Sequence, residues 1–250
     1  MLNVAAYLSR CNYAGVTVPT PETLRELHRA HLLAVPFENL DIHLGRKIVC
    51  DEDAFIRKIV SERRGGFCYE LNGAFASLLR ALGFQVTLLS ARVAGADGGN
   101  GPEFDHLTIR VDLEEPWLAD VGFGDGFLEP LRLEPGGEQR QIGRIYRLRE
   151  SEGVFRLEVM ADDKWKGEYS FTLQPRQLSE FAAMCHYHQT SLESHFTRKR
   201  ICSRATAEGR ITLSDETLIE TRNGVRQERV LLGEEECRAK LHELFGVTLP

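Results

Sequence analysis

The sequence predicts an α+β protein, because the periodicity of its apolar residues changes twice along the 250-residue chain. Up to Gly83 apolar side chains recur every three or four residues, as in helices that bury one face. From Phe84 to Leu173 apolar and polar residues alternate, as in half-buried strands. From Pro175 the helical pattern returns, and mixed segments lead to a terminal helix at 234–245. We therefore expect a helical bundle, then an antiparallel barrel or sandwich, then a mixed third part.

Three helices are expected in the first part. Thr20 can cap a helix that starts at Pro21, because proline is well tolerated at the first helical position, and Pro36 ends this helix. A second helix is expected at 53–64, and a third at 68–83, where a glycine stops the apolar repeat.

Six strands are expected in the middle of the chain, and glycine-rich or proline-containing turns separate them. They are predicted at 84–93, 106–113, 117–121, 144–149, 154–160 and 165–173.

The segment 63–72, Arg-Arg-Gly-Gly-Phe-Cys-Tyr-Glu-Leu-Asn, places a cysteine where a glycine-rich turn becomes a helix. Gly65 and Gly66 disfavour helix, and they would let a substrate approach the sulfur without meeting side chains. A thiol at Cys68 would lie beside unpaired N–H groups and the positive end of the helix dipole, which lower the pKa of the thiol and favour the nucleophilic thiolate. The alternative is that Cys68 is a small buried apolar side chain.

Two downstream segments offer partners for this thiol. His106 opens an alternating strand, and Asp120 stands in the short apolar run 117–121, where a carboxylate is costly to bury unless it has a partner. Taken singly, His106 could be an ordinary strand-edge histidine and Asp120 a turn residue. Together they predict a Cys68–His106–Asp120 triad for covalent acyl transfer, in which the Asp orients the His and the His takes the thiol proton. The same residues would serve a thiol protease equally well.

The composition excludes several classes of function. A formal net charge of −6 argues against nucleic acid as a partner, because phosphate binding favours a basic surface. No apolar run approaches the length of a membrane span, and the N-terminus lacks the basic start and apolar stretch of a secretory signal, so a cytoplasmic location is expected. The residues give no indication of the oligomeric state.

The six cysteines are scattered, which disfavours a disulfide framework or a structural zinc site. The segment 185–188, Cys-His-Tyr-His, is a possible exception. On a helix its two histidines would point in different directions, and no third ligand is evident nearby, so no metal site is expected.

The segments that carry the triad resemble those of a known family, the arylamine N-acetyltransferases. The run at 64–70 resembles the family's nucleophile motif, and Asp-Val-Gly-Phe-Gly at 120–124 resembles its acid motif. His106 stands at the matching position before an apolar strand, and 36–40 is similar to an early segment of the family. The resemblance is strong over the first half of the chain and looser over the second.

The resemblance implies a helical bundle at 1–83 that carries the nucleophile, a β-barrel at 84–174 that carries His and Asp, and a short C-terminal α/β lid at 175–250, with a papain- or transglutaminase-like core. It also implies ping-pong transfer of an acetyl group from acetyl-CoA, a co-substrate rather than a tightly bound cofactor, to the nitrogen of an arylamine or arylhydrazine. By the same resemblance Phe37 and Phe123 line the acceptor pocket, although both could be ordinary core residues.

The sequence contains no glycine-rich phosphate loop of the Walker or Rossmann type. Arg198, Lys199 and Arg200 are candidates to pair with the phosphates of CoA, although a run of this kind is more often a solvated surface.

Three other functions stay open. Macrolactam-forming amide synthases resemble the same family and take acyl chains from a carrier protein. Such a bulky acyl donor needs a wide entrance to the active site, which a short C-terminal lid would leave. A papain- or transglutaminase-like hydrolase would use the same triad without CoA. A non-catalytic binding module is disfavoured, because such a protein has little reason to keep Asp120 in an apolar strand.

Overall fold

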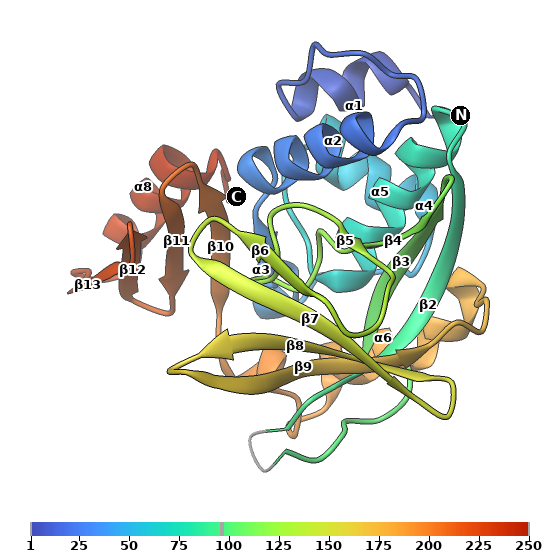
Figure 1. The fold of residues 1–250 in the computed structure, drawn as a ribbon. Helices are drawn as coiled ribbons and strands as arrows, with labels where there is room; N and C mark the ends of the chain where they lie inside the picture. Colours follow the sequence, from blue (N-terminus) through green and yellow to red (C-terminus); the bar gives the residue numbers. More distant parts are fainter. Residues whose placement is uncertain (1, 96–97, 250) are drawn as a thin grey trace.

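A computed structural model of the chain describes residues 2–95 and 98–249. Figure 1 shows helices of the N-terminal third packed above a large twisted sheet, with a second, smaller sheet and the C-terminal helix beside them. The predicted α+β fold class is confirmed, and the large sheet is nearly closed into a barrel. Among the described residues no helix is long and apolar enough to cross a membrane.

The N-terminal part is built around one buried helix, α5. The helices of this part are α1 (Val4–Arg10), α2 (Pro21–Ala34), α3 (Leu40–His43), α4 (Glu52–Ile56), η1 (Arg57–Ser61) and α5 (Cys68–Ala81). The Thr20 side chain caps α2 as predicted, since its hydroxyl oxygen accepts from the Thr23 N–H at 3.2 Å. The helix expected at 53–64 is not uniform, because α4 changes into the π-helical turn η1 at Arg57.

The large sheet is antiparallel throughout and runs in the order β5-β4-β3-β2-β9-β8-β7-β6. Its strands are β2 (Gln85–Val93), β3 (His106–Asp112), β4 (Pro116–Ala119), β5 (Leu131–Arg132), β6 (Glu138–Gln141), β7 (Arg144–Ser151), β8 (Val154–Ala161) and β9 (Lys164–Thr172). The sequence predicted six of these strands and missed the short edge strands β5 and β6.

Side-chain amides join the two edge strands. Gln139 accepts from the Arg132 N–H at 2.8 Å and donates to the Arg132 carbonyl at 2.9 Å, as a strand backbone would. The Gln141 side chain makes the same pair of bonds with Glu129: it accepts from the Glu129 N–H at 3.1 Å and donates to the Glu129 carbonyl at 2.6 Å. These contacts close the sheet into a barrel, and they explain why a sandwich does not form.

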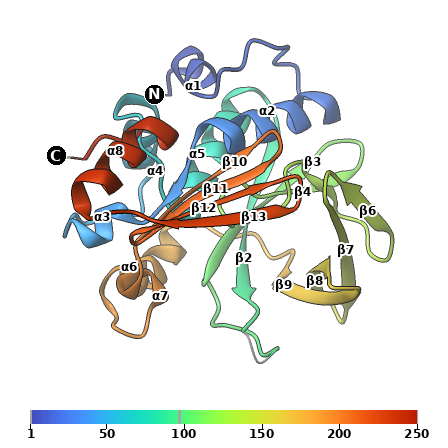
Figure 2. The ribbon, with the colours of Figure 1, turned by 90° about the vertical axis from the view of Figure 1, so that its left-hand side faces the viewer.

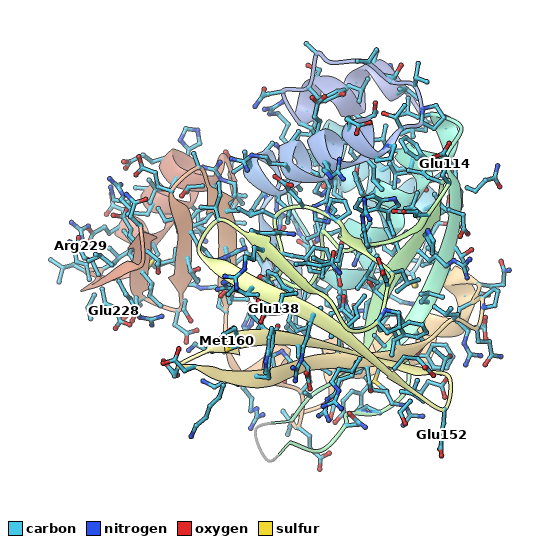
Figure 3. The ribbon with its side chains drawn as sticks, viewed as in Figure 1. Glu114, Glu138, Glu152, Met160, Glu228 and Arg229 are labelled. Carbon is cyan, nitrogen blue, oxygen red and sulfur yellow. The ribbon has the colours of Figure 1, made fainter. Side chains whose placement is uncertain are left out.

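The C-terminal part contains η2 (Leu178–Phe181), α6 (Ala182–Thr190), α7 (His195–Arg198), β10 (Ile201–Thr206), β11 (Gly209–Ser214), β12 (Thr217–Arg222), β13 (Val225–Val230) and α8 (Glu234–Phe245). The smaller sheet, in the order β1-β10-β11-β12-β13, includes β1 (Phe37–Glu38) from the N-terminal part. Figure 2 shows this sheet with β13 on its outside, and Figure 3 shows Glu228 and Arg229 on β13 pointing outward. The division at 83/84 and 174/175 stays a proposal.

Candidate active site

The turn before α5 brings the chain into close contact with itself. A Cβ at Gly65 would lie 1.9 Å from the Pro36 carbonyl oxygen, and one at Gly66 would lie 2.6 Å from the Glu70 side chain. Both glycines are buried and serve the packing of the turn, and their role in leaving an approach for substrate stays a prediction. Glu70 also caps α5, because its carboxylate accepts from the Phe67 N–H at 3.0 Å.

A network of five buried charges surrounds this turn, and the sequence did not reveal it. The Arg64 guanidinium lies 2.8 Å from Glu38, and the Lys58 ammonium lies 2.8 Å from both Asp41 and Glu70. Burial raises the pKa of Glu70 to about 7, although Lys58 acts against this. The turn that delivers Cys68 is therefore held by ion pairs that are satisfied among themselves.

His106 is the first residue of β3 and lies two residues after a strained residue, Phe104. Phe104 has φ of 65°, a left-handed conformation that a bulky side chain rarely adopts. Two hydrogen bonds hold it there: Ser90 accepts from the Phe104 N–H at 2.8 Å, and the Tyr69 hydroxyl donates to the Phe104 carbonyl at 2.8 Å. The helix that carries Cys68 thus fixes, through Tyr69, the backbone that aims His106.

His106 and Asp120 form the pair that the sequence predicted. The His106 Nε2 lies 2.6 Å from the Asp120 Oδ2, and both side chains are buried. Asp120 also accepts from the Tyr169 hydroxyl at 2.9 Å and from the Gly122 N–H at 3.0 Å. Burial alone would raise the pKa of Asp120, but His106 and the hydrogen bonds lower it below its usual value. Asp120 therefore holds the Nε2–H tautomer and leaves Nδ1 free to act as a base.

Asn72 joins the triad elements, and its role was not predicted. Its amide donates to Asp120 at 2.8 Å and to the Leu107 carbonyl at 2.6 Å, and its carbonyl accepts from the Val121 N–H at 2.8 Å. It lies one helical turn after Cys68, so it faces the same side of α5 as the thiol. This spacing within the cysteine motif is the signal that could have identified it.

A cavity of about 790 Å³ opens over the thiol between the barrel and the smaller sheet. Cys68 and His106 line it, together with Phe37, Phe123 and Phe196. The Phe123 ring lies edge-on to the His106 ring at a centroid separation of 5.2 Å. Both phenylalanines named from the sequence therefore lie in the wall of one cavity with the nucleophile.

The comparisons with known proteins agree with this geometry. A family model described as N-acetyltransferase matches residues 20–250. An arylamine N-acetyltransferase / N-hydroxyarylamine O-acetyltransferase from Salmonella typhimurium is 38% identical over 213 residues, which cover 84% of this chain and 76% of that protein. The chain belongs to the arylamine N-acetyltransferase family. The structure of the Mycobacterium marinum arylamine N-acetyltransferase in complex with CoA has a TM-score of 0.91 and 32% identity, covering 98% of this chain and 92% of that chain.

The family membership confirms the predicted recognition and, through the neighbouring structure, the cysteine-protease-like core. The chain is also similar to the proansamycin X synthase of Amycolatopsis mediterranei, at 33% identity over 263 residues and 98% of both chains. The family model nevertheless describes an N-acetyltransferase, so an amide synthase, a thiol hydrolase and a non-catalytic module are not favoured.

The thiol of this N-acetyltransferase is only 4% exposed. Burial raises the pKa of Cys68 well above its usual value, and the N–H groups of Leu107 and Tyr69 compensate only in part. The predicted lowering of the pKa by the helix start is therefore wrong for the thiol taken alone. A thiolate at Cys68 requires that its proton move to a neighbouring base, because the resulting ion pair shares the burial cost.

The three cations proposed for CoA lie in different surroundings. Lys199 lines the cavity. Arg200 instead pairs with Glu234 at 2.9 Å on α8, and Arg198 donates to the Glu193 carbonyl at 3.2 Å. Only Lys199 of this run is available to a ligand above Cys68.

Further arginines line the cavity that the sequence did not indicate. Arg144 and Arg210 both bind Asp125, with nitrogen-to-oxygen distances of 2.6 and 2.8 Å. Asp125 follows the acid motif directly, so these contacts tie that loop to β7 of the barrel and β11 of the smaller sheet. Because Arg144 and Arg210 lie more than 60 residues apart in the sequence, no local sequence pattern reveals that they share one carboxylate.

The histidines at 186 and 188 lie on α6 and do not converge, as predicted for helical spacing. His186 is exposed, whereas His188 is buried against Asp105. Within residues 2–95 and 98–249 no three His, Cys, Asp or Glu side chains form a group that could hold a metal ion.

Proposed function

We propose that the protein transfers an acetyl group from acetyl-CoA to the nitrogen of an arylamine or arylhydrazine, through an acetyl-Cys68 intermediate. The observation that carries the proposal is that His106, which pairs with the buried Asp120 at 2.6 Å, lines the same cavity as Cys68. The family and the solved relative in complex with CoA support the donor.

The first half-reaction begins with proton transfer from Cys68 to the Nδ1 of His106, while Asp120 stabilises the imidazolium. The thiolate attacks the thioester carbonyl of acetyl-CoA. Because Cys68 is the first residue of α5, its N–H lacks a partner within the helix and is the proposed donor to the oxyanion. The intermediate collapses, the C–S bond to CoA breaks, and His106 returns the proton to the departing thiol.

The second half-reaction reverses these roles. The amine attacks the acetyl carbonyl, His106 takes the proton that the nitrogen loses, and the bond to the Cys68 sulfur breaks to release the amide and restore the thiol. A buried thioester favours transfer over hydrolysis because water is largely excluded from it.

Aromatic side chains suit the proposed acceptor. Phe37 and Phe123 line the cavity near the nucleophile, where a flat ring can stack or pack edge-on. For the CoA phosphates we propose Lys199, with Arg144 and Arg210 on the cavity wall, rather than Arg198 and Arg200. The proposed partners are thus small molecules, with no nucleic acid and no membrane, and the proposed location is the cytoplasm.

The experiment that tests this function is the intact mass of the protein after brief exposure to acetyl-CoA without acceptor. We expect one acetyl group, located on Cys68 by peptide mapping and removed when an arylamine is added. Cys68→Ser is the control, which keeps the fold and gains no acetyl group. Acetylation of the serine variant to the same extent, or an adduct that an arylamine does not remove, would contradict the proposal.

A further inference from the structure

The cavity wall near the nucleophile contains an unexpected charge. Three carboxylates line the described part of the cavity, on Asp105, Asp125 and Glu208. Asp125 is neutralised by two arginines, and Glu208 lies on an exposed turn at the rim. Asp105 directly precedes His106, and its charge acts on Cys68, whose pKa it helps to raise. One carboxylate therefore lies close to the reacting sulfur.

Asp105 is poorly satisfied by the protein. Its side chain is 17% exposed, and among the described residues it has no lysine or arginine partner and accepts no hydrogen bond. Its one ion-pair contact is with the buried His188, whose Nε2 lies 3.1 Å from Oδ1. His195, also in the cavity wall, is no cation to balance it, because burial and the neighbouring His188 lower the pKa of His195.

The position of this carboxylate is fixed by its surroundings. The Tyr69 hydroxyl donates to the Asp105 carbonyl at 3.2 Å. On the other side, a Cβ at Gly101 would lie 2.7 Å from the Asp105 Oδ2, so the chain passes close to the carboxylate. A half-buried carboxylate in an aromatic cavity is costly unless a ligand supplies a donor or a positive charge.

We infer that Asp105 selects the acceptor: it favours arylamines or arylhydrazines that carry a cationic substituent and disfavours those that carry a carboxylate. This inference rests on the proposed function. A cationic substituent beside Asp105 gains a charge contact in a site that is partly dry, where Coulomb interactions are stronger than in water. An anionic substituent places two negative charges together and loses affinity for the same reason.

Three anilines of nearly equal size test the inference. Their para substituents are dimethylaminomethyl, isobutyl and carboxymethyl, which are cationic, neutral and anionic at neutral pH, and none adds a second nitrogen that can be acetylated. We expect kcat/KM for acetyl transfer to be about tenfold higher for the cationic than for the neutral acceptor, and about tenfold lower for the anionic one. In Asp105→Asn these ratios should approach one, and Asp105→Ser provides a second variant.

Glu103→Gln is the matched control, since Glu103 lies two residues away, pairs with Arg92 and Arg176, and is not in the cavity wall. It should leave the ratios unchanged. The mass assay for acetyl-Cys68 shows that each variant folds and reacts with the donor.

Equal kcat/KM for the three acceptors in the wild type would overturn the inference while the proposed function stands. A uniform loss in Asp105→Asn, with the ratios preserved, would also overturn it and assign Asp105 to structure through His188. Failure of all acceptors and of Cys68 acetylation would instead contradict the proposed function.

Discussion

Two polar networks meet at the start of α5, and they differ in what they leave unsatisfied. In the charge network, Lys58 and Arg64 bind three buried carboxylates, and every member has a partner inside the protein. In the triad network, Asp120 is saturated with hydrogen bonds, but the Nδ1 of His106 has no hydrogen-bond partner among the residues that the structure describes. The first network therefore determines whether the turn forms, and the second determines how fast the thiol reacts.

The largest effect on rate is expected for Asp120→Asn, which should lower kcat by about 10⁴-fold, because an amide no longer holds the reactive tautomer of His106. It should also cost about 1–3 kcal/mol of stability, because the amide nitrogen would face buried donors. Steady-state acetyl transfer and thermal unfolding measure the two effects. Asp112→Asn, which changes a half-buried carboxylate at the other end of β3, is the control. A loss of kcat below tenfold would assign the acid role to another residue.

The largest effect on folding is expected for Lys58→Met, which leaves Asp41 and Glu70 without their shared cation. Removing one partner of a buried pair costs about 3–5 kcal/mol. Urea unfolding measures this loss, and Arg57→Met, an exposed neighbour, should change stability by less than about 1 kcal/mol. Similar values for the two variants would show that the buried network does not hold the turn.

Asn72→Ala should affect both properties, because Asn72 belongs to the triad network and also ties two strands to α5. Leaving buried polar groups unpaired costs about 1–3 kcal/mol of stability. We also expect kcat to fall by about tenfold or more, since His106 and Asp120 lose their common support. A change in stability with kcat intact would make Asn72 purely structural.

The last effect is a dependence of stability on pH. Because burial raises the pKa of Glu70 from 4.5 to about 7, its contribution to stability is fully present below pH 4.5 and is lost as the pH rises through 7. The loss relative to Glu70→Gln should be on the order of 2–3 kcal/mol between pH 5 and 8. Urea unfolding across this range measures it, and parallel pH profiles for the two proteins would contradict the raised pKa.

The sequence predicted those parts of the fold whose signals are local. Thr20 and Pro21 mark the start of α2, and Cys68 marks that of α5, as expected from capping residues and glycine turns. The strands β10–β13 were not predicted individually. For β13 the reason is that every residue is exposed, so the strand shows no apolar alternation.

In the candidate site, too, the residues with a local sequence signal were predicted, and the contacts that depend on the tertiary fold were not. Cys68, His106 and Asp120 could be identified because each stands in a distinctive local segment. The pairing of Glu38 with Arg64, and of Asp125 with Arg210, joins residues that are distant in sequence and depends on the tertiary fold. The raised pKa of Cys68 also depends on burial, which a helix-start motif does not encode.

The central claim is that the Cys68 thiolate exists only because His106 accepts its proton. The most direct test is the rate at which iodoacetamide alkylates Cys68 as a function of pH, in the wild type and in His106→Gln. We predict that the wild type is labelled at Cys68 before the other five cysteines at neutral pH, and that His106→Gln reacts at this site only at much higher pH, because burial then keeps the thiol protonated. Equal labelling of Cys68 in the two proteins at neutral pH would contradict the account.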